Sequence, residues 1–236
     1  MPSSRVFRKI HVRESDITII TESEKYIAIA LESLHNARNI LEKVITEYPE
    51  FKTSFTPYFT QNTSEVILQM QRAAQLADVG PMASVAGVLA DIMVQEMKRN
   101  GAHIAVVENG GEIKIHSQED IRVGLYSHTT QIKDKIGFLF KGGSEDLGIG
   151  TSSGTFGHAF SFGEADTVTV FASSAGVADA TATKIANLIH RKEMKQNLER
   201  ALKIAESLDF IHGVFITCGK FVAKTGTVPP LVFSKQ

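Results

Sequence analysis

The spacing of hydrophobic residues along this chain changes twice from short alternating runs to helical stretches and back, and this order limits the fold. Alternating runs within residues 5–22 predict a β-hairpin, and apolar residues at helical spacing predict a helix over 24–48. The same patterns predict helices at about 63–77, 83–99, 178–190 and 193–207, and strands at 103–107, 112–116, 121–127, 136–140, 166–172, 211–217 and 220–224. Strands and helices in separate runs favour an α+β fold over an alternating βαβ fold.

Length and composition limit the size of the core. The chain has 236 residues, of which 43% are hydrophobic and 22% are charged, and this allows one large core or two small ones. We expect a single domain over residues 1–236, with two similar halves of about 1–110 and 111–236 as a further possibility. The sequence shows no clear internal repeat between these halves.

Charge and cysteine content exclude several classes of partner and site. The formal net charge is −1 and no run of five basic residues occurs, so nucleic acid is not an expected partner. The one cysteine, Cys218, excludes an intramolecular disulfide and a thiolate metal cluster within the chain. The N-terminal residues contain no apolar run of signal-peptide length, and no stretch approaches the roughly 18 apolar residues of a membrane span. We therefore expect a soluble cytoplasmic protein with no membrane partner.

Two segments combine residue types that can bind a ligand. Residues 148–154 place small hydroxyl residues between glycines, which predicts a turn whose N–H and O–H groups face an anion or a heterocycle; a plain surface turn is the competing interpretation. In Asp179-Ala-Thr-Ala-Thr183, helical spacing would put Asp179 and Thr183 on one face, where they could hold a hard cation such as magnesium. The competing interpretation makes Asp179 an ordinary helix N-cap.

Three further features add candidates. Residues 78–83 form a rigid turn before a helix, and a helix N-terminus attracts anions, although a simple connection is the alternative. Residues 108–112 read as a hairpin turn with Asn-Gly at its centre. His158 follows the glycine-rich segment, and an imidazole can act as a general base near neutral pH.

Together, and in this order, these segments resemble the ApbE family of FAD:protein FMN transferases. The resemblance covers residues 78–183 and rests on four stretches: Asp78-Val-Gly-Pro-Met-Ala83, Glu108-Asn-Gly-Gly-Glu112, Thr151-Ser-Ser-Gly154 with His158 after it, and Ala178-Asp-Ala-Thr-Ala-Thr183. The run Gly-Thr-Ser-Ser-Gly-Thr-Phe-Gly-His is most similar to a shorter ApbE-like family of archaea and anaerobic bacteria.

The resemblance implies an α+β fold, a duplicated T-fold of antiparallel strands with paired helices, and a set of site residues. The Asp179 carboxylate, the Thr183 hydroxyl and the Ala83 carbonyl would hold magnesium, and His158 would be the catalytic residue. FAD or FMN would be contacted by residues of the three glycine-containing segments: Gly80, Met82, Asn109, Gly110, Gly111, Glu112, Thr151, Ser152, Ser153 and Gly154. The acceptor of FMN would be a threonine on a partner protein.

This sequence also departs from the family pattern at the phosphate-binding end. Ser84 stands where the family has a lysine, and Pro81 stands where it has a second glycine. Three functions therefore stay open: a protein that binds a flavin, nucleotide or other anionic small molecule without transferring it, a magnesium-dependent FMN transferase, and a non-catalytic T-fold oligomer. In the third case four aromatic residues could line the interface between copies: Phe51, Phe55, Tyr58 and Phe59.

Overall fold

The computed structural model describes residues 5–125, 136–153, 163–190 and 192–233, and it contains two antiparallel sheets. The large sheet has the order β1-β2-β3-β4-β7-β8-β9-β10, with strands β1 (Val6–Val12), β2 (Ser15–Thr21), β3 (Ile104–Asn109), β4 (Glu112–Ser117), β7 (Leu147–Ser152), β8 (Thr167–Ala172), β9 (Gly213–Cys218) and β10 (Phe221–Gly226). The small sheet has the order β11-β6-β5, with β5 (Ile121–Gly124), β6 (Ile136–Phe140) and β11 (Leu231–Phe233). The fold is α+β, as the sequence predicted.

Helices occupy two places in this order. The first group lies between β2 and β3 and comprises α1 (Glu24–Glu47), α2 (Glu50–Thr53), α3 (Glu65–Ala77), the 3-10 turn η1 (Pro81–Ser84) and α4 (Val85–Arg99). The second group lies between β8 and β9 and comprises α5 (Ala175–Ala186) and α6 (Met194–Glu206). Each group therefore separates two pairs of adjacent strands, which is the duplicated arrangement of a T-fold. In this order β4 (Glu112–Ser117) groups with the first half, although it follows the predicted boundary near residue 110. The division into two halves stays a proposal.

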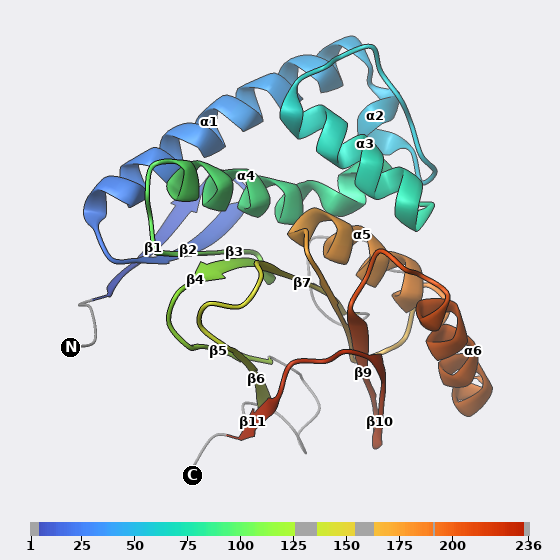
Figure 1. Ribbon diagram of the computed structural model, residues 1–236. Coiled ribbons are helices and arrows are strands. Elements are labelled where there is room, and N and C mark those ends of the chain that lie inside the picture. Colours follow the sequence, from blue (N-terminus) through green and yellow to red (C-terminus); the bar gives the residue numbers. More distant parts are fainter. Residues whose placement is uncertain (1–4, 126–135, 154–162, 191, 234–236) are drawn as a thin grey trace.

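The large sheet lies between the helices and the small sheet (Figure 1). On the helical side, the buried residues of β2 and β3 pack with α1 and α4, and those of β8 and β9 pack with α5 and α6. On the other side, Phe138 of the small sheet meets Phe171 and Phe215 of the large sheet edge to face, at centroid distances of 4.9 and 5.5 Å. Both faces of the central strands are thus buried, which is why β8 and β9 are apolar along most of their length.

Glycines allow α5 to lie directly on the sheet and on α4. A Cβ atom added to Gly150 would lie 2.6 Å from Asp179 Cα, and one added to Gly148 would lie 2.6 Å from the Ser174 carbonyl oxygen. A Cβ added to Gly87 of α4 would lie 2.7 Å from Gly176 N in α5. The expected turn at 148–154 is therefore wrong for residues 148–152, because these residues lie in strand β7 and their glycines allow α5 to pack on the strand.

The start of α5 differs from the predicted start at about residue 178. Ser174 is the N-cap, and its side chain accepts a hydrogen bond from Val177 N at 3.1 Å. Asp179 lies within the helix, and its carboxylate accepts from Gly87 N of another helix. The N-cap interpretation of Asp179 is therefore wrong, because α5 begins four residues earlier, at Ala175.

Replacing Ser174 by alanine should lower the free energy of unfolding by at least about 1 kcal/mol, because an N–H at the start of α5 loses its partner and the Asp91 carboxylate loses a donor. Ser64, the N-cap residue of α3, makes no side-chain cap hydrogen bond and provides the matched control, so Ser64→Ala should change stability little. Urea unfolding of both variants measures the difference. Equal losses at the two positions would show that the Ser174 cap does not stabilise the fold.

The segment between α1 and α3 also corrects one expectation. It contains the short helix α2, and Phe51 is fully buried against Tyr58, with ring centroids 6.5 Å apart. Phe51 thus belongs to the core and not to an interface, whereas Tyr58 is partly buried against the core and Phe55 and Phe59 are exposed. Among the described residues, no single helix is long and apolar enough to cross a membrane. Only α3 taken together with η1–α4 reaches that length and apolar composition, and this pair is bent by 101°.

Candidate functional site

Four segments that the sequence marked as candidates come together around Asp179 of α5. The Asp179 carboxylate accepts a hydrogen bond from Gly87 N at 3.1 Å, which ties α5 to the first turn of α4. Glu112, the first residue of β4, interacts directly with the same carboxyl group and with the backbone of Thr151 in β7. Asn109 at the end of β3 donates from its side chain to the Ala86 carbonyl at 3.0 Å. The site therefore joins two helices and three strands.

Asp179 and Glu112 form a buried pair of carboxyl groups. Burial raises the pKa of Asp179 to about 7, although hydrogen bonds from Gly87 and Glu112 act in the opposite direction, and the charge of Asp91 adds to the increase. Burial and the neighbouring Asp179 charge raise the pKa of Glu112 well above its ordinary value. Two like charges at one buried place cannot both ionise easily, so the pair retains a proton near neutral pH.

A third carboxylate, Asp91 of α4, is fully engaged at the start of α5. It accepts hydrogen bonds from the Ser174 hydroxyl at 2.7 Å and from Ala175 N and Gly176 N, both at 2.9 Å. Its other neighbour is the Lys114 ammonium, 3.5 Å away. A negative charge is stable at a helix N-terminus, so Asp91 positions α5, and with it Asp179, against α4.

Thr183 lies one turn after Asp179 on the same face of α5. It is 8% exposed, and within the described part of the chain its hydroxyl makes no hydrogen bond. Ala83 lies in η1 and packs against the cluster that contains Ala180 of α5. The described ranges contain no group of three or more His, Cys, Asp or Glu residues that could hold a metal. Asp179, Glu112 and Thr183 thus offer a small set of hard oxygen donors and not a complete cage.

The β3–β4 turn has its amide groups occupied. Gly110 N donates to Asp16 O and Gly111 N donates to a Glu108 carboxylate oxygen, both at 3.0 Å. Both glycines have positive φ, of 66° and 113°, which few other residues adopt. The predicted turn is therefore present. It connects β3 to β4 and so places Glu112 directly after the two glycines.

The other predicted cofactor residues take different positions. Since side chains alternate along β7, Ser152 shares the α5 side with Gly150, and Thr151 lies on the opposite face, where its hydroxyl meets that of Thr169 at 3.2 Å. Ser153 donates to the Asp166 carbonyl at 2.8 Å. A Cβ on Gly80 would lie 2.8 Å from the Ser54 carbonyl carbon, so this glycine permits a close backbone contact.

The remaining predicted positions complete the comparison with the sequence. Met82 packs against the core between α1, α3 and α4. Gly154 and His158 lie outside the described residues, so the catalytic assignment of His158 stays a prediction. The sequence analysis did not identify Gly87 or Asp91. Asp91 could have been found, because it is an acidic residue on the buried face of an otherwise apolar helix.

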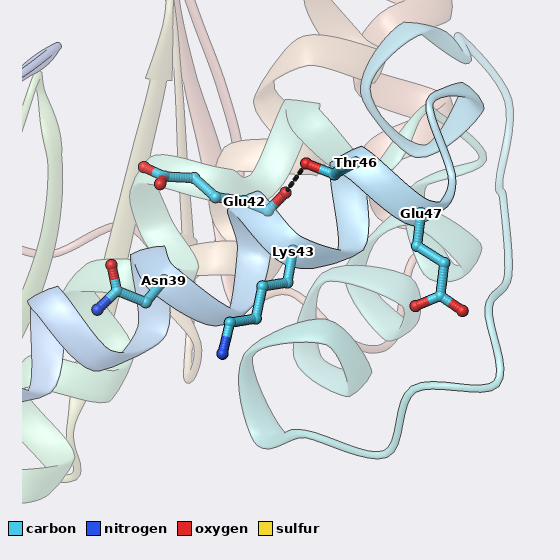
Figure 2. Close-up of a pocket in the computed structure, with 5 residues that line it drawn as sticks. All are labelled: Asn39, Glu42, Lys43, Thr46 and Glu47. Atoms are coloured by element: carbon cyan, nitrogen blue, oxygen red, sulfur yellow. Dashed lines mark hydrogen bonds between the residues drawn. The ribbon is translucent and has the colours of Figure 1, made fainter.

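A separate depression of about 470 Å³ lies along the outer face of α1 and does not resemble a site. Its lining side chains all come from that one helix: Asn39, Glu42, Lys43, Thr46 and Glu47. Figure 2 shows them spreading outward, and the Thr46 hydroxyl donates to the Glu42 carbonyl at 2.8 Å. Nothing converges on a common point, so this is a solvated helix face.

Comparison with known proteins identifies the family. The family model described as "AbpE bacteria" matches residues 1–221. A UPF0280 protein of Methanococcus aeolicus is 36% identical over 230 residues, covering 96% of this chain and 92% of the relative. A UPF0280 protein of Archaeoglobus fulgidus is 38% identical over 231 residues, covering 97% and 95%.

Solved structures agree at the level of the fold. The flavin transferase ApbE from Vibrio cholerae is 14% identical and superposes with a TM-score of 0.60, over 96% of this chain and 98% of that one. The ApbE protein from Thermotoga maritima is 13% identical with a TM-score of 0.60, over 95% and 97%. With a family model over most of its length and curated relatives above 30% identity, the chain belongs to the ApbE-like family that includes the archaeal UPF0280 proteins.

Proposed function

We propose that this protein binds a flavin nucleotide, FAD or FMN, through a divalent cation such as magnesium at Asp179 and Thr183. The observation that carries the proposal is the buried pair of Asp179 and Glu112, with the unpaired Thr183 hydroxyl beside it. Buried carboxylates are ordinarily paired with cations or bound to metals. In the part of the chain that the structure describes, neither Asp179 nor Glu112 forms an ion pair with a lysine or arginine, and Lys114 lies beside Asp91.

The donor set fits magnesium better than a cation held by protein alone. Magnesium is commonly bound by one or two carboxylates and completes its shell with water and substrate phosphates. Asp179, Glu112 and Thr183 supply hard oxygens of this kind, and Ala83 would add a backbone carbonyl from η1. When bound, such a cation would neutralise the phosphates of the nucleotide.

The phosphate-binding end of the site supports a role for the cation. Ser84, which replaces the lysine of the family pattern, is buried and donates to the Pro81 carbonyl at 2.8 Å. No positive side chain thus enters from this turn. The Asp179–Glu112 pair lies in the same site, so an anionic ligand would be repelled when this pair is ionised unless a cation accompanied it.

The flavin transferase names of the structural neighbours favour a second candidate, transfer of FMN from FAD to a threonine of a partner protein. In this reaction the threonine oxygen bonds to the phosphorus of the FMN half, the pyrophosphate bond breaks and AMP leaves. His158 would take the hydroxyl proton. Incubation with FAD, magnesium and a threonine-bearing acceptor should yield AMP and a covalently flavinylated acceptor, detected by mass spectrometry.

The binding proposal can be tested by flavin fluorescence, because the protein has no tryptophan. We expect FAD to bind with magnesium present and to be released by EDTA. Thr183→Val removes the unpaired hydroxyl at constant shape, so its melting temperature should stay the same or rise while magnesium-dependent affinity falls roughly tenfold.

Magnesium-independent binding, or unchanged affinity in Thr183→Val, would contradict the assignment of the cation to this face of α5. If no flavin binds to a correctly folded protein, the non-catalytic oligomer becomes the better function. Light scattering would then distinguish this third candidate, because a monomer in solution would exclude it.

A further inference from the structure

A second polar pocket lies at the far end of α4 from the candidate site. It has a volume of about 530 Å³ and is open to solvent. Its described lining comprises Lys98 of α4, Lys114 and His116 of β4, Gly143, Ser144, the acidic Glu145 and Asp146 before β7, and Ser173 before α5. Lys98 is 11 positions after Gly87, so about 16 Å of helix separates the pocket from the Asp179 contact.

One carboxylate in this pocket is shared by two donors. Lys98 Nζ donates to Asp146 Oδ2 at 2.9 Å, and His116 Nδ1 lies 2.7 Å from Asp146 Oδ1. Burial would raise the pKa of Asp146, but the hydrogen bonds from Lys98 and His116 and the charges of His116 and Lys114 outweigh it, so the pKa is lowered. Asp146 therefore stays ionised and fixes the orientation of both donors.

The remaining donors are positioned for a ligand. Because Asp146 holds Nδ1 of His116, the Nε2 atom is the ring nitrogen left for another partner, and the side chain is only 14% exposed. Lys114 is 11% exposed and donates to the Ser173 carbonyl while it neighbours Asp91. Lys98 is 49% exposed and keeps donors beyond the one used by Asp146.

We infer that this pocket binds a doubly charged oxyanion, of which inorganic phosphate is the simplest, between Lys98, Lys114 and His116. Two ammonium groups and an imidazole face one space, and a bound oxyanion would accept hydrogen bonds from all three. The Asp146 carboxylate already shows that an anionic oxygen pair fits between Lys98 and His116. The proposed anion site uses none of Asp179, Glu112 and Thr183, although Lys114 also pairs with Asp91, which holds the start of α5.

Isothermal titration with inorganic phosphate at constant ionic strength tests the inference. We expect saturable binding to the unmodified protein and a dissociation constant at least tenfold higher in Lys98→Gln and His116→Gln. Lys141 provides a matched control, since it forms a lysine–aspartate pair with Asp120 at 3.0 Å outside the pocket. Lys141→Gln should therefore bind phosphate as the unmodified protein does.

Three results would overturn the inference. The absence of saturable phosphate binding, or equal affinity in all four proteins, would mean that the cluster only fastens the β6–β7 connection to α4. Acetate binding as tightly as phosphate would contradict a doubly charged ligand. Lys98 is half exposed, so Lys98→Gln should fold even if His116→Gln does not, and thermal melts of each variant verify this.

Discussion

Replacing Gly87 by alanine should destabilise the protein by about 3 kcal/mol, because its methyl group would meet the backbone of α5. The added Cβ would lie 2.7 Å from Gly176 N and closer still to the Ala175 carbonyl, and backbone atoms cannot move aside as a flexible side chain can. Helix propensity alone predicts the opposite sign, since alanine in a helix is favoured over glycine by up to about 1 kcal/mol. Urea unfolding gives the sign directly.

Gly124 is the matched control for this change. No atom of the described residues lies within 4 Å of a Cβ added to it, and it has no positive φ, so Gly124→Ala should leave stability within about 0.5 kcal/mol of the unmodified protein. If Gly87→Ala proves neutral or stabilising, the close crossing of α4 and α5 is wrong, and with it the hydrogen bond from Gly87 N to Asp179.

Replacing Asp179 by asparagine should abolish magnesium-dependent flavin binding and at the same time stabilise the protein above neutral pH. The asparagine oxygen can still accept from Gly87 N, but the amide carries no charge for a cation, so affinity should fall by roughly a hundredfold or more. Flavin fluorescence with and without magnesium measures this loss. The exposed Asp209→Asn variant is the control and should behave as the unmodified protein.

The stability effect follows from the raised pKa of Asp179. Below its ordinary value of 3.8 the group is protonated in both the folded and the unfolded chain, so it does not oppose folding. Between 3.8 and about 7 the unfolded chain releases the proton while the folded one keeps it, so stability falls as pH rises and the loss is complete above about 7. The difference between a pKa of 3.8 in the unfolded chain and about 7 in the folded one corresponds to a loss of stability on the order of 4 kcal/mol.

Asparagine removes this cost, but Glu112 stays buried beside it and still opposes folding when it ionises. We therefore expect Asp179→Asn to gain about 2 kcal/mol of stability at pH 8 and much less at pH 4. Unfolding curves at the two pH values provide the comparison. A variant that is less stable at pH 8 would show that Asp179 is already compensated by a cationic neighbour, and would contradict the cation site.

Local sequence patterns determined the helices and most strands. The hairpin at 5–22 and the helix at 24–48 depend on the spacing of apolar residues within each segment, and the structure confirms both as β1–β2 and α1. The turn at Gly110-Gly111 likewise follows from residues that adopt positive φ. The order of the candidate segments also indicated the family.

The tertiary structure alone decided which of these segments meet and what their residues do. Gly87 and Asp179 are 92 positions apart, and nothing local to either predicts their hydrogen bond. Gly148 and Gly150 have the composition of a turn, yet they lie in β7, because a glycine that permits a turn also permits a helix to pack on a strand. The raised pKa of Asp179 arises from burial, with a contribution from the Asp91 charge, and both depend on how the whole chain folds.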